Sequence, residues 1–399
     1  MISRLRRAAT AESVTVLAPG SDTAFTLIGD DWSAGFSVSD GSVVPHDDVM
    51  AEFTLAATDE LWDALISPRP RRDAHSLIQL VRAGSIAVRG SVLAYERSIH
   101  VVRALIDAAR ATAGHADTGG PLTARGSYHR VTTSLGTSDV YVERAGSGAP
   151  LLTFATAGSD TSQWHGMMTH TSITDHYELI TADLPWHGRS SPAWGRPVGS
   201  YALTPETYTE WIVAVADALA LEQPIIVGVS MGGAAVVHAV ATHPHRFAGA
   251  VSCQAAVSVA ARAHKHLRST EVNSSLFIPE WVSGLMNPAS PREFTDRVWW
   301  GYSSGGFGLY AADIDSYLSW DFEHIEQSLT SESPHIAVLS GAFDTSVPSE
   351  RSRELADRIP NASFALMPEL GHFPHAENPP VFAQHLREAL GRVLVSRSK

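Results

Sequence analysis

Residues 224–240 read PIIVGVSMGGAAVVHAV, and this stretch is the strongest structural signal in the chain. The apolar run before Gly228 is typical of a strand buried on both faces, and the small residues after Ser230 continue directly into a helix. Gly228 and Gly232 flank the serine, where a very sharp turn leaves no room for side chains. The pattern therefore predicts a strand, a tight turn that carries Ser230, and a helix whose N-terminus favours negative charge beside it.

Apolar runs of strand length recur on both sides of residues 224–240, with helical patterns between them. Strands are predicted at residues 150–158, 177–185, 223–230, 247–256, 335–344 and 362–372, after an initial hairpin at residues 128–146. Strands that alternate with helices form βαβ units, and continuous apolar runs indicate strands covered on both faces. The sequence from about Tyr128 onward therefore predicts an α/β domain with a mostly parallel sheet.

A serine at such a turn is a candidate nucleophile if a base stands beside it, because its hydroxyl is unreactive at neutral pH. Histidine, with an ordinary pKa of about 6.5, is the usual base, and an acid fixes its tautomer. Among 19 histidines we select His372, which follows the last predicted strand, and the acid we select is Asp344, which ends the preceding strand. The predicted triad is Ser230, Asp344 and His372, in that chain order.

Three motifs around these residues resemble those of the α/β-hydrolase family. They are G-x-S-x-G at residues 228–232, G-x-x-D-x-x-V-P at residues 341–348 and G-H-x-x-x-x-E-x-P at residues 371–379. The resemblance implies an α/β-hydrolase fold in which Ser230 is the nucleophile, His372 the general base and Asp344 the residue that orients it. Some relatives take the acid from the strand after the elbow, but residues 252–258 contain no carboxylate, which favours Asp344.

The same resemblance implies an oxyanion hole made of two backbone N–H groups. One belongs to Met231, directly after the nucleophile, and the other to the loop after the strand that ends at Ala157 and Gly158. Because these two residues stand where the family usually has His-Gly, the second donor is expected to be Ser159. The segment DLPWHGRS at residues 183–190 matches a structural loop of the family, D-x-x-G-x-G-x-S, with Trp186 where glycine is usual, and no chemistry is assigned to His187 or Asp183.

A long segment at about residues 257–333 separates two predicted strands and is expected to form a helical cap. It is rich in aromatic side chains, which can line an apolar pocket or pack the core of the cap itself. The predicted pocket residues are four tryptophans, Trp164, Trp186, Trp299 and Trp300.

The N-terminal part of the chain predicts a smaller α+β domain over residues 1–112, followed by a linker of Gly, Thr and Ala at residues 113–127. Its antiparallel strands are expected at residues 13–18, 23–29, 34–40 and 51–57, and its helices near residues 58–65, 75–84 and 96–110, with a strand at 85–90. The succession of a strand, the TDELWDAL helix, a second helix and then RAGSIAVRGS resembles the sterol-carrier-protein lipid-transfer fold, over roughly Val14 to Arg110. The resemblance implies an apolar ligand between sheet and helices; a scaffold with a filled core is the alternative.

Composition limits the function classes. The net charge of −13 over 399 residues opposes nucleic-acid binding, which needs a basic surface. The single cysteine, Cys253, excludes an intrachain disulfide and is expected to be a buried, inert thiol. No metal-ligand or phosphate-binding motif occurs, so no metal and no cofactor are expected. Without a signal peptide or membrane span in the sequence, the expected location is cytoplasmic. The oligomeric state stays open, and a homo-oligomer is compatible with the sequence.

These features together predict a cofactor-free serine hydrolase that cleaves an ester, lactone or thioester of a small apolar substrate through an acyl-enzyme. One alternative is a carbon–carbon bond hydrolase of the meta-cleavage type, which shares the triad and a similar S-M-G-G elbow. The other alternative is a non-catalytic receptor or carrier that only binds an apolar ligand. Turnover of simple esters distinguishes the first function from both alternatives.

Overall fold

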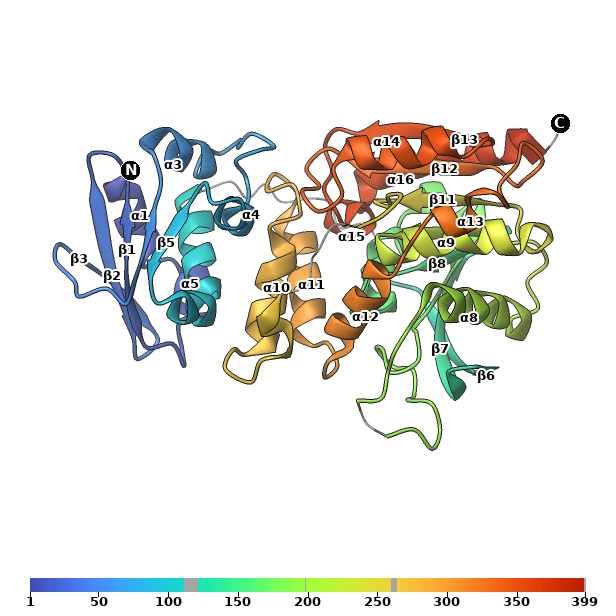
Figure 1. Cartoon of the computed structure of the whole chain (residues 1–399), viewed down its shortest axis with the longest axis horizontal. Helices are drawn as coiled ribbons and strands as arrows, with labels where there is room; N and C mark the ends of the chain where they lie inside the picture. Colours follow the sequence, from blue (N-terminus) through green and yellow to red (C-terminus); the bar gives the residue numbers. More distant parts are fainter. Residues whose placement is uncertain (111–120, 198, 260–263, 398–399) are drawn as a thin grey trace. The chain divides into compact units, whose positions relative to one another are not determined.

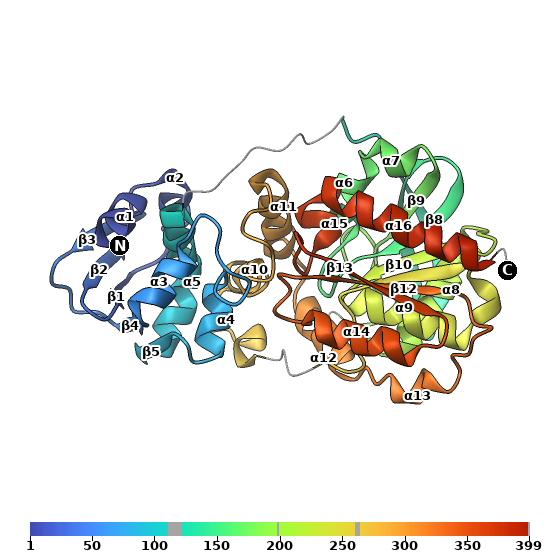
Figure 2. The ribbon, with the colours of Figure 1, turned by 90° about the horizontal axis from the view of Figure 1, so that it is seen from above.

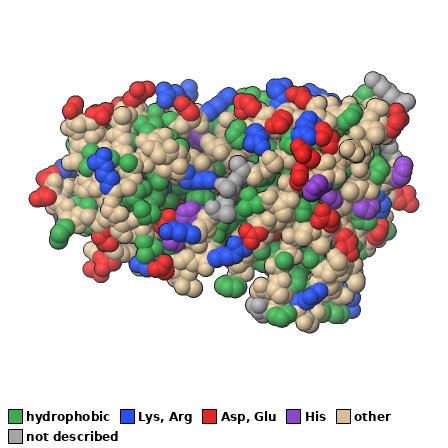
Figure 3. Space-filling view, in the orientation of Figure 1, with side chains coloured by type: hydrophobic (Ala, Val, Ile, Leu, Met, Phe, Trp, Pro, Cys, Tyr) green, Lys and Arg blue, Asp and Glu red, His purple; other side chains and the backbone are tan. Residues whose placement is uncertain are grey.

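The computed structural model describes residues 1–110, 121–197, 199–259 and 264–397, which fold into two compact units (Figure 1). The first unit falls within Met1–His115 and takes in Ser269–Ala289, and the second falls within Ala116–Arg268 and Ser290–Lys399. Residues 113–120 of the predicted linker lie outside the described residues. On the face drawn in Figure 3, acidic and basic side chains are interspersed over each unit.

The first unit contains a five-stranded sheet in the order β3-β2-β1-β4-β5. Its strands are β1 Thr23–Ile28, β2 Ser33–Ser39, β3 Ser42–His46, β4 Phe53–Ala56 and β5 Ala87–Gly90. The predicted all-antiparallel sheet is wrong, because β4 lies parallel to β1. After the β1–β2–β3 meander the chain crosses back, so that β4 pairs with β1 on its open edge.

The strand predicted at residues 13–18 is also wrong, since the chain there forms helices α1 Ile2–Ala8 and α2 Glu12–Thr15. In a strand Val14, Val16 and Ala18 would share one face. In the structure Val14 and Ala18 are fully buried whereas Val16 is 61% exposed, which is the spacing of a helical turn. Burial against the rest of the unit has overridden the local β-branched pattern.

Four further helices complete the first unit, and the core lies between the helices and the sheet. They are α3 Asp59–Leu65, α4 Leu77–Arg82, α5 Val92–Arg110 and α10 Ser274–Ser283. The Thr58 side chain caps α3 by accepting the Leu61 N–H. Phe25 stacks on Phe36 and Phe53 with ring centroids 5.3 and 5.4 Å apart, so aromatic side chains fill the middle of this core.

The second unit is built on an eight-stranded sheet in the order β13-β12-β11-β10-β8-β9-β7-β6. Its strands are β6 Arg125–Thr133, β7 Gly136–Gly146, β8 Ala149–Phe154, β9 Tyr177–Ala182, β10 Ile225–Val229, β11 Gly249–Cys253, β12 Ile336–Gly341 and β13 Ala362–Met367. The six strands from β13 to β9 pair in parallel, and β7 and β6 are antiparallel additions at one edge. The mostly parallel sheet and the opening hairpin are as predicted.

Helices cover both faces of this sheet (Figure 2). One face carries α6 His165–Met168, α7 Thr171–Thr174 and α16 Pro379–Arg397, and the other carries α8 Pro205–Ala218, α9 Met231–Thr242 and α14 Ser349–Arg358. Strand and helix side chains between them form a core that includes Val227, Val251, Leu339, Phe382 and Leu386. In open α/β sheets of this kind, binding sites lie outside the carboxyl ends of the parallel strands.

The segment between β11 and β12 supplies helices to both units. Its first helix, α10, belongs to the first unit, whereas α11 Arg292–Ser303, α12 Leu309–Leu318 and α13 Glu323–Glu326 belong to the second. Among the described helices, none is both long and apolar enough to cross a membrane.

Candidate active site

Ser230 stands at the sharp turn between β10 and α9. Its φ angle of 58° lies in the left-handed region, and its N–H donates to the Cys253 carbonyl at 2.8 Å. A Cβ on Gly228 would lie 2.0 Å from the Gly232 carbonyl oxygen, and one on Gly232 would lie 2.8 Å from the Ala155 oxygen. Both glycines are therefore required for the turn, as the G-x-S-x-G pattern predicts, and the loop after β8 passes directly beside it.

His372 and Asp344 form a buried hydrogen-bonded pair. The distance between His372 Nδ1 and Asp344 Oδ2 is 2.6 Å, and both side chains are at most 1% exposed. The other oxygen of Asp344, Oδ1, accepts the N–H groups of Ser346 and Val347 at 2.7 and 3.0 Å. These hydrogen bonds hold the carboxylate of Asp344 in place beside His372, so Asp344 can fix the tautomer of His372 and stabilise its protonated form.

The residue before His372 is held by two side chains that are fully buried. The Gly371 N–H donates to Glu377 Oε1 at 2.6 Å, and the Gly371 carbonyl accepts from Gln254 Nε2 at 2.6 Å. Gln254 also accepts the Gly341 N–H at 3.0 Å, so it joins the loop of His372 to the loop of Asp344. Glu377 was visible in the sequence motif, but Gln254 was missed; its signal is its place at the end of β11, where some relatives carry the acid.

The loop after β8 differs from the sequence prediction in one important respect. The Ser159 N–H, predicted as an oxyanion donor, donates to the Thr156 carbonyl at 3.2 Å within the loop, so in this structure it is already engaged. The Thr156 and Gly158 N–H groups are also engaged, by Gln163 Oε1 at 3.2 Å and by Asp313 Oδ2 at 2.7 Å. Within the described part of the chain, the Ala157 N–H is the one amide of residues 156–159 that lacks an acceptor.

Comparison with known proteins places this arrangement in a family. The family model described as the alpha/beta hydrolase fold matches residues 150–379, more than half of the chain. The chain belongs to the α/β-hydrolase fold family. The sterol-carrier resemblance of the first unit lies outside this match and stays a prediction.

Individual relatives of this α/β-hydrolase are distant. A protein named "putative non-heme haloperoxidase" from Mycobacterium phage D29 is 29% identical over 259 residues, which cover 56% of this chain and 82% of the relative. A thermophilic esterase from Thermogutta terrifontis superposes with a TM-score of 0.58 at 22% identity, over 67% of this chain and 99% of the esterase. An enol-lactonase from Burkholderia xenovorans LB400 gives a TM-score of 0.55 at 18% identity, over 64% and 97%. These solved structures share the fold.

The four tryptophans predicted to line a pocket of this α/β-hydrolase occupy different environments. Trp164 has no exposed surface and packs on His375 with ring centroids 4.5 Å apart, so it is a core residue and the prediction is wrong. Trp300 is 68% exposed, and its place in a pocket stays a prediction. Trp299 is partly exposed, and only Trp186 lines a described pocket.

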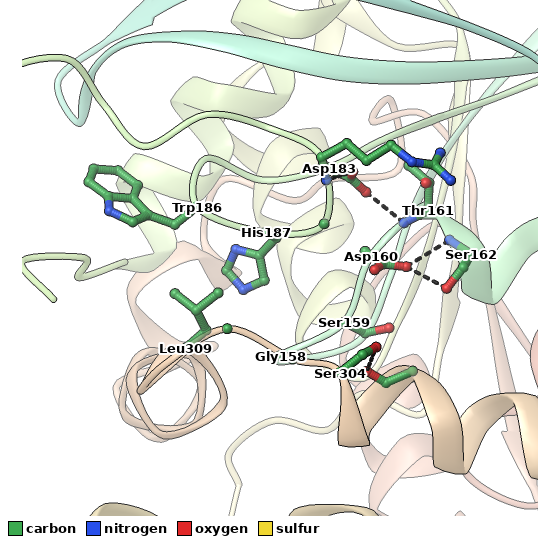
Figure 4. A pocket seen from close by; sticks show the side chains of 15 residues that line it. Gly158, Ser159, Asp160, Thr161, Ser162, Asp183, Trp186, His187, Ser304 and Leu309 are labelled. Carbon is green, nitrogen blue, oxygen red and sulfur yellow. Dashed lines mark hydrogen bonds between the residues drawn. The ribbon is translucent and has the colours of Figure 1, made fainter. Parts of the chain in front are cut away.

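That pocket, of about 300 Å³, lies beside the loop after β8 (Figure 4). Its walls come from residues 158–162, 183 and 186–189, and from the inserted residues 301, 304–306 and 309, and they include none of the triad residues. Burial and the neighbouring Asp160 raise the pKa of Asp183 to about 7, although the Arg189 and Thr161 N–H groups act against this rise. The carboxyl of Asp183 thus serves the loop, as the family pattern implies.

Cys253 is fully buried at the end of β11, and burial raises the pKa of its thiol. A thiol with a raised pKa forms little thiolate at neutral pH and is unreactive. Among the described residues there is no group of three or more His, Cys, Asp or Glu side chains that could hold a metal ion.

Proposed function

We propose that this protein is a serine hydrolase that cleaves an ester, lactone or thioester of a small apolar substrate through an acyl-enzyme. The observation that carries the proposal is the buried Asp344–His372 pair, which lies in the same unit as a strained serine at the end of a parallel strand. Strained backbone of this kind occurs mainly at functional sites.

In the acylation step Ser230 Oγ attacks the carbonyl carbon while His372 takes the hydroxyl proton on Nε2, because its Nδ1 proton is held by Asp344. The carbonyl π electrons move to oxygen and form an oxyanion, to which the N–H groups of Met231 and Ala157 donate. The bond to the leaving alcohol or thiol then breaks, and His372 returns the proton to that group. The acyl group remains esterified to Ser230.

In the deacylation step water takes the place of the alcohol. His372 removes a proton from water, the resulting hydroxide attacks the acyl carbon, and a second oxyanion forms at the same two N–H groups. When it collapses, the bond to Ser230 Oγ breaks and the serine recovers its proton from His372. The products are the carboxylic acid and the unchanged enzyme, so water is the only co-substrate.

The inserted helices α11 and α12 are proposed to act as a cap on this unit. They supply Tyr302 and Asp313 to the loop after β8, next to the elbow. The aromatic content of the insertion favours an apolar substrate. Activity on vinylogous diketo acids with none on simple esters would instead identify a carbon–carbon bond hydrolase.

The decisive test is labelling of the full-length protein with a fluorophosphonate probe, followed by mass spectrometry of the peptides. We expect one adduct, on Ser230, that is lost in Ser230→Ala and retained in Ser172→Ala, a control serine on α7 of the same unit. Hydrolysis of p-nitrophenyl esters should follow the same pattern. A wild-type protein that binds an apolar ester without labelling or turnover would support the carrier function instead.

A further inference from the structure

One peptide group in the loop after β8 is held at both ends by the inserted helices. The Tyr302 hydroxyl, on α11, donates to the Ala157 carbonyl at 3.1 Å, and the Gly158 N–H donates to Asp313 Oδ2, on α12, at 2.7 Å. This carbonyl and this N–H belong to the same trans peptide, so they point in opposite directions. Two helices therefore hold the Ala157–Gly158 peptide from opposite sides.

The acceptor on α12 is itself rigidly fixed. Asp313 has no exposed surface, its Oδ1 accepts the Tyr201 hydroxyl at 2.7 Å, and its Oδ2 lies 3.0 Å from His187 Nε2. The other ring nitrogen of His187 donates to the Pro185 carbonyl at 3.1 Å. Burial alone would lower the pKa of His187, but the hydrogen bond and the charge of Asp313 outweigh burial and raise it.

Side-chain packing further restricts the conformation of this loop. Gly158 has a φ angle of 69°, and a Cβ there would lie 2.7 Å from the Tyr310 ring and 2.9 Å from its Cα. Tyr310 lies three residues before Asp313 on α12, so one face of that helix supplies both contacts to Gly158. Figure 4 shows His187 from the loop after β9 and Leu309 from the start of α12 lying close to Gly158 and Ser159.

The held peptide is next to the donor that the reaction needs. The Ala157 carbonyl is part of the Ala157–Gly158 peptide, whereas the Ala157 N–H is part of the Thr156–Ala157 peptide. Because the two planar peptides meet at the Ala157 Cα, fixing the Ala157–Gly158 peptide limits the rotation of the Thr156–Ala157 peptide. The preceding peptide is also anchored through Thr156, whose Oγ1 lies 2.5 Å from the Tyr302 hydroxyl. The direction of the Ala157 N–H is thus set by side chains that lie more than 140 residues away in the sequence.

We propose that Tyr302 and Asp313 are positioning residues that aim the Ala157 N–H at the oxyanion, and this inference rests on the proposed serine hydrolase function. The inserted helices then control the rate of acyl transfer by holding a peptide group. An oxyanion donor acts only when it points to the place where charge develops, so its loss costs rate more than substrate affinity.

The test uses the full-length protein with Tyr302→Phe and Asp313→Asn, and with Trp320→Phe as a matched control. Trp320 is a buried residue just after α12 whose Nε1 donates to the Ala256 carbonyl at 3.0 Å, so the control also removes one side-chain hydrogen bond to the backbone. For a p-nitrophenyl ester we expect kcat to fall about 10- to 100-fold in the two variants, with KM within about twofold. Affinity for a boronic acid, which forms a tetrahedral adduct on serine, should fall by the same factor.

Three results would overturn the inference, and they separate it from the proposed function. If wild-type Ser230 reacts with the fluorophosphonate but both variants keep kcat and boronate affinity, the positioning role of Tyr302 and Asp313 is wrong, whereas the proposed hydrolase function is still supported. If KM rises while kcat is unchanged, the inserted residues bind substrate and do not aim the donor. If wild-type Ser230 does not react, both proposals fall. Should Asp313→Asn not fold, Tyr302→Phe, which removes one hydroxyl, decides alone.

Discussion

The second unit contains two buried histidine–aspartate pairs, and they differ in what the histidine can still do. In one pair His372 Nδ1 lies 2.6 Å from Asp344, and in the other His187 Nε2 lies 3.0 Å from Asp313. Asp344 follows the carboxyl end of β12, whereas Asp313 lies in the middle of α12. All four side chains are at most 2% exposed, so burial does not distinguish the two pairs.

The difference lies in the second nitrogen of each ring. His187 donates its Nδ1 proton to the Pro185 carbonyl and directs Nε2 at Asp313, so both ring nitrogens serve the fold. His372 uses Nδ1 for Asp344, and the proposed mechanism assigns proton transfer to Nε2. We propose that what the second nitrogen faces decides whether such a pair serves as a general base or as a structural contact, and the following experiments test this distinction.

The largest contrast should come from replacing each histidine in turn. We expect His372→Gln to lower kcat for a p-nitrophenyl ester by about 10⁴- to 10⁶-fold, because the general base is lost. His187→Gln should lower it by about 10-fold through the loop that Asp313 holds. Steady-state kinetics with an active-site count from fluorophosphonate labelling measures both effects. Equal losses in the two variants would mean that the pairs do not have separate roles.

Replacing each aspartate in turn should affect different quantities, kcat for Asp344 and the free energy of unfolding for Asp313. Asp344→Asn is expected to lower kcat by about 10⁴-fold, because the wrong tautomer of His372 is favoured. Asp313→Asn leaves a charged His187 without its partner in a dry site and should lower the free energy of unfolding by about 3 kcal/mol. Urea denaturation of both variants checks this, and a greater destabilisation in Asp344→Asn would contradict it.

Another buried histidine, His375, has no carboxylate partner among the residues that the structure describes, and it provides a pH-dependent contrast. Burial and the nearby His372 lower its pKa to about 3, so it is neutral in the folded state. Because the unfolded chain binds this proton with a pKa of about 6.5, the stability that neutral His375 contributes is present above pH 6.5 and is lost as pH falls toward 3. Between pH 7 and pH 5 the free energy of unfolding of the wild type should fall by about 2 kcal/mol more than that of His375→Gln. Parallel stability curves for the two proteins would contradict this.

The smallest effect should have the opposite sign and concerns His187. Its pKa is raised in the folded state, where it faces Asp313, Asp183 and Tyr201. A raised pKa means that its contribution to stability is full below pH 6.5 and is lost as pH rises through the folded-state value. The difference in free energy of unfolding between wild type and His187→Gln should therefore be larger at pH 6 than at pH 9. A difference that grows with pH would show that His187 is neutral.

The sequence predicted those parts of the fold and site that local patterns encode. The strand–turn–helix at Ser230 and the strand ends at Asp344 and His372 are each visible within ten residues. What it missed depends on long-range contacts: Asp313 reaches Gly158 across 155 residues, and Gln254 reaches Gly371 across 117. Such hydrogen bonds leave no periodic signal in the sequence.

The choice of Ser159 as the second oxyanion donor also depended on hydrogen bonds that the sequence does not reveal. The sequence places Ser159 after an Ala-Gly pair that stands where relatives have His-Gly, and only the hydrogen bonds of the folded loop reveal which amide is used internally. At the N-terminus the alternation around Val14 and Val16 predicted a strand, because the local sequence does not show which of these side chains is buried in the first unit.

The place of α10 has a consequence for the order in which the protein is made. This helix belongs to the first unit, where Glu280 pairs with Arg103 and the Arg82 guanidinium lies 4.7 Å above the Trp281 ring. Yet it leaves the ribosome 173 residues after the end of α5, which is residue 283 minus residue 110. At about 5–20 residues per second, the first unit waits roughly ten to thirty seconds for its last helix. During that time strands β6 to β11 of the hydrolase sheet are synthesised. Glu280, the buried partner of Arg103, is still missing from the first unit.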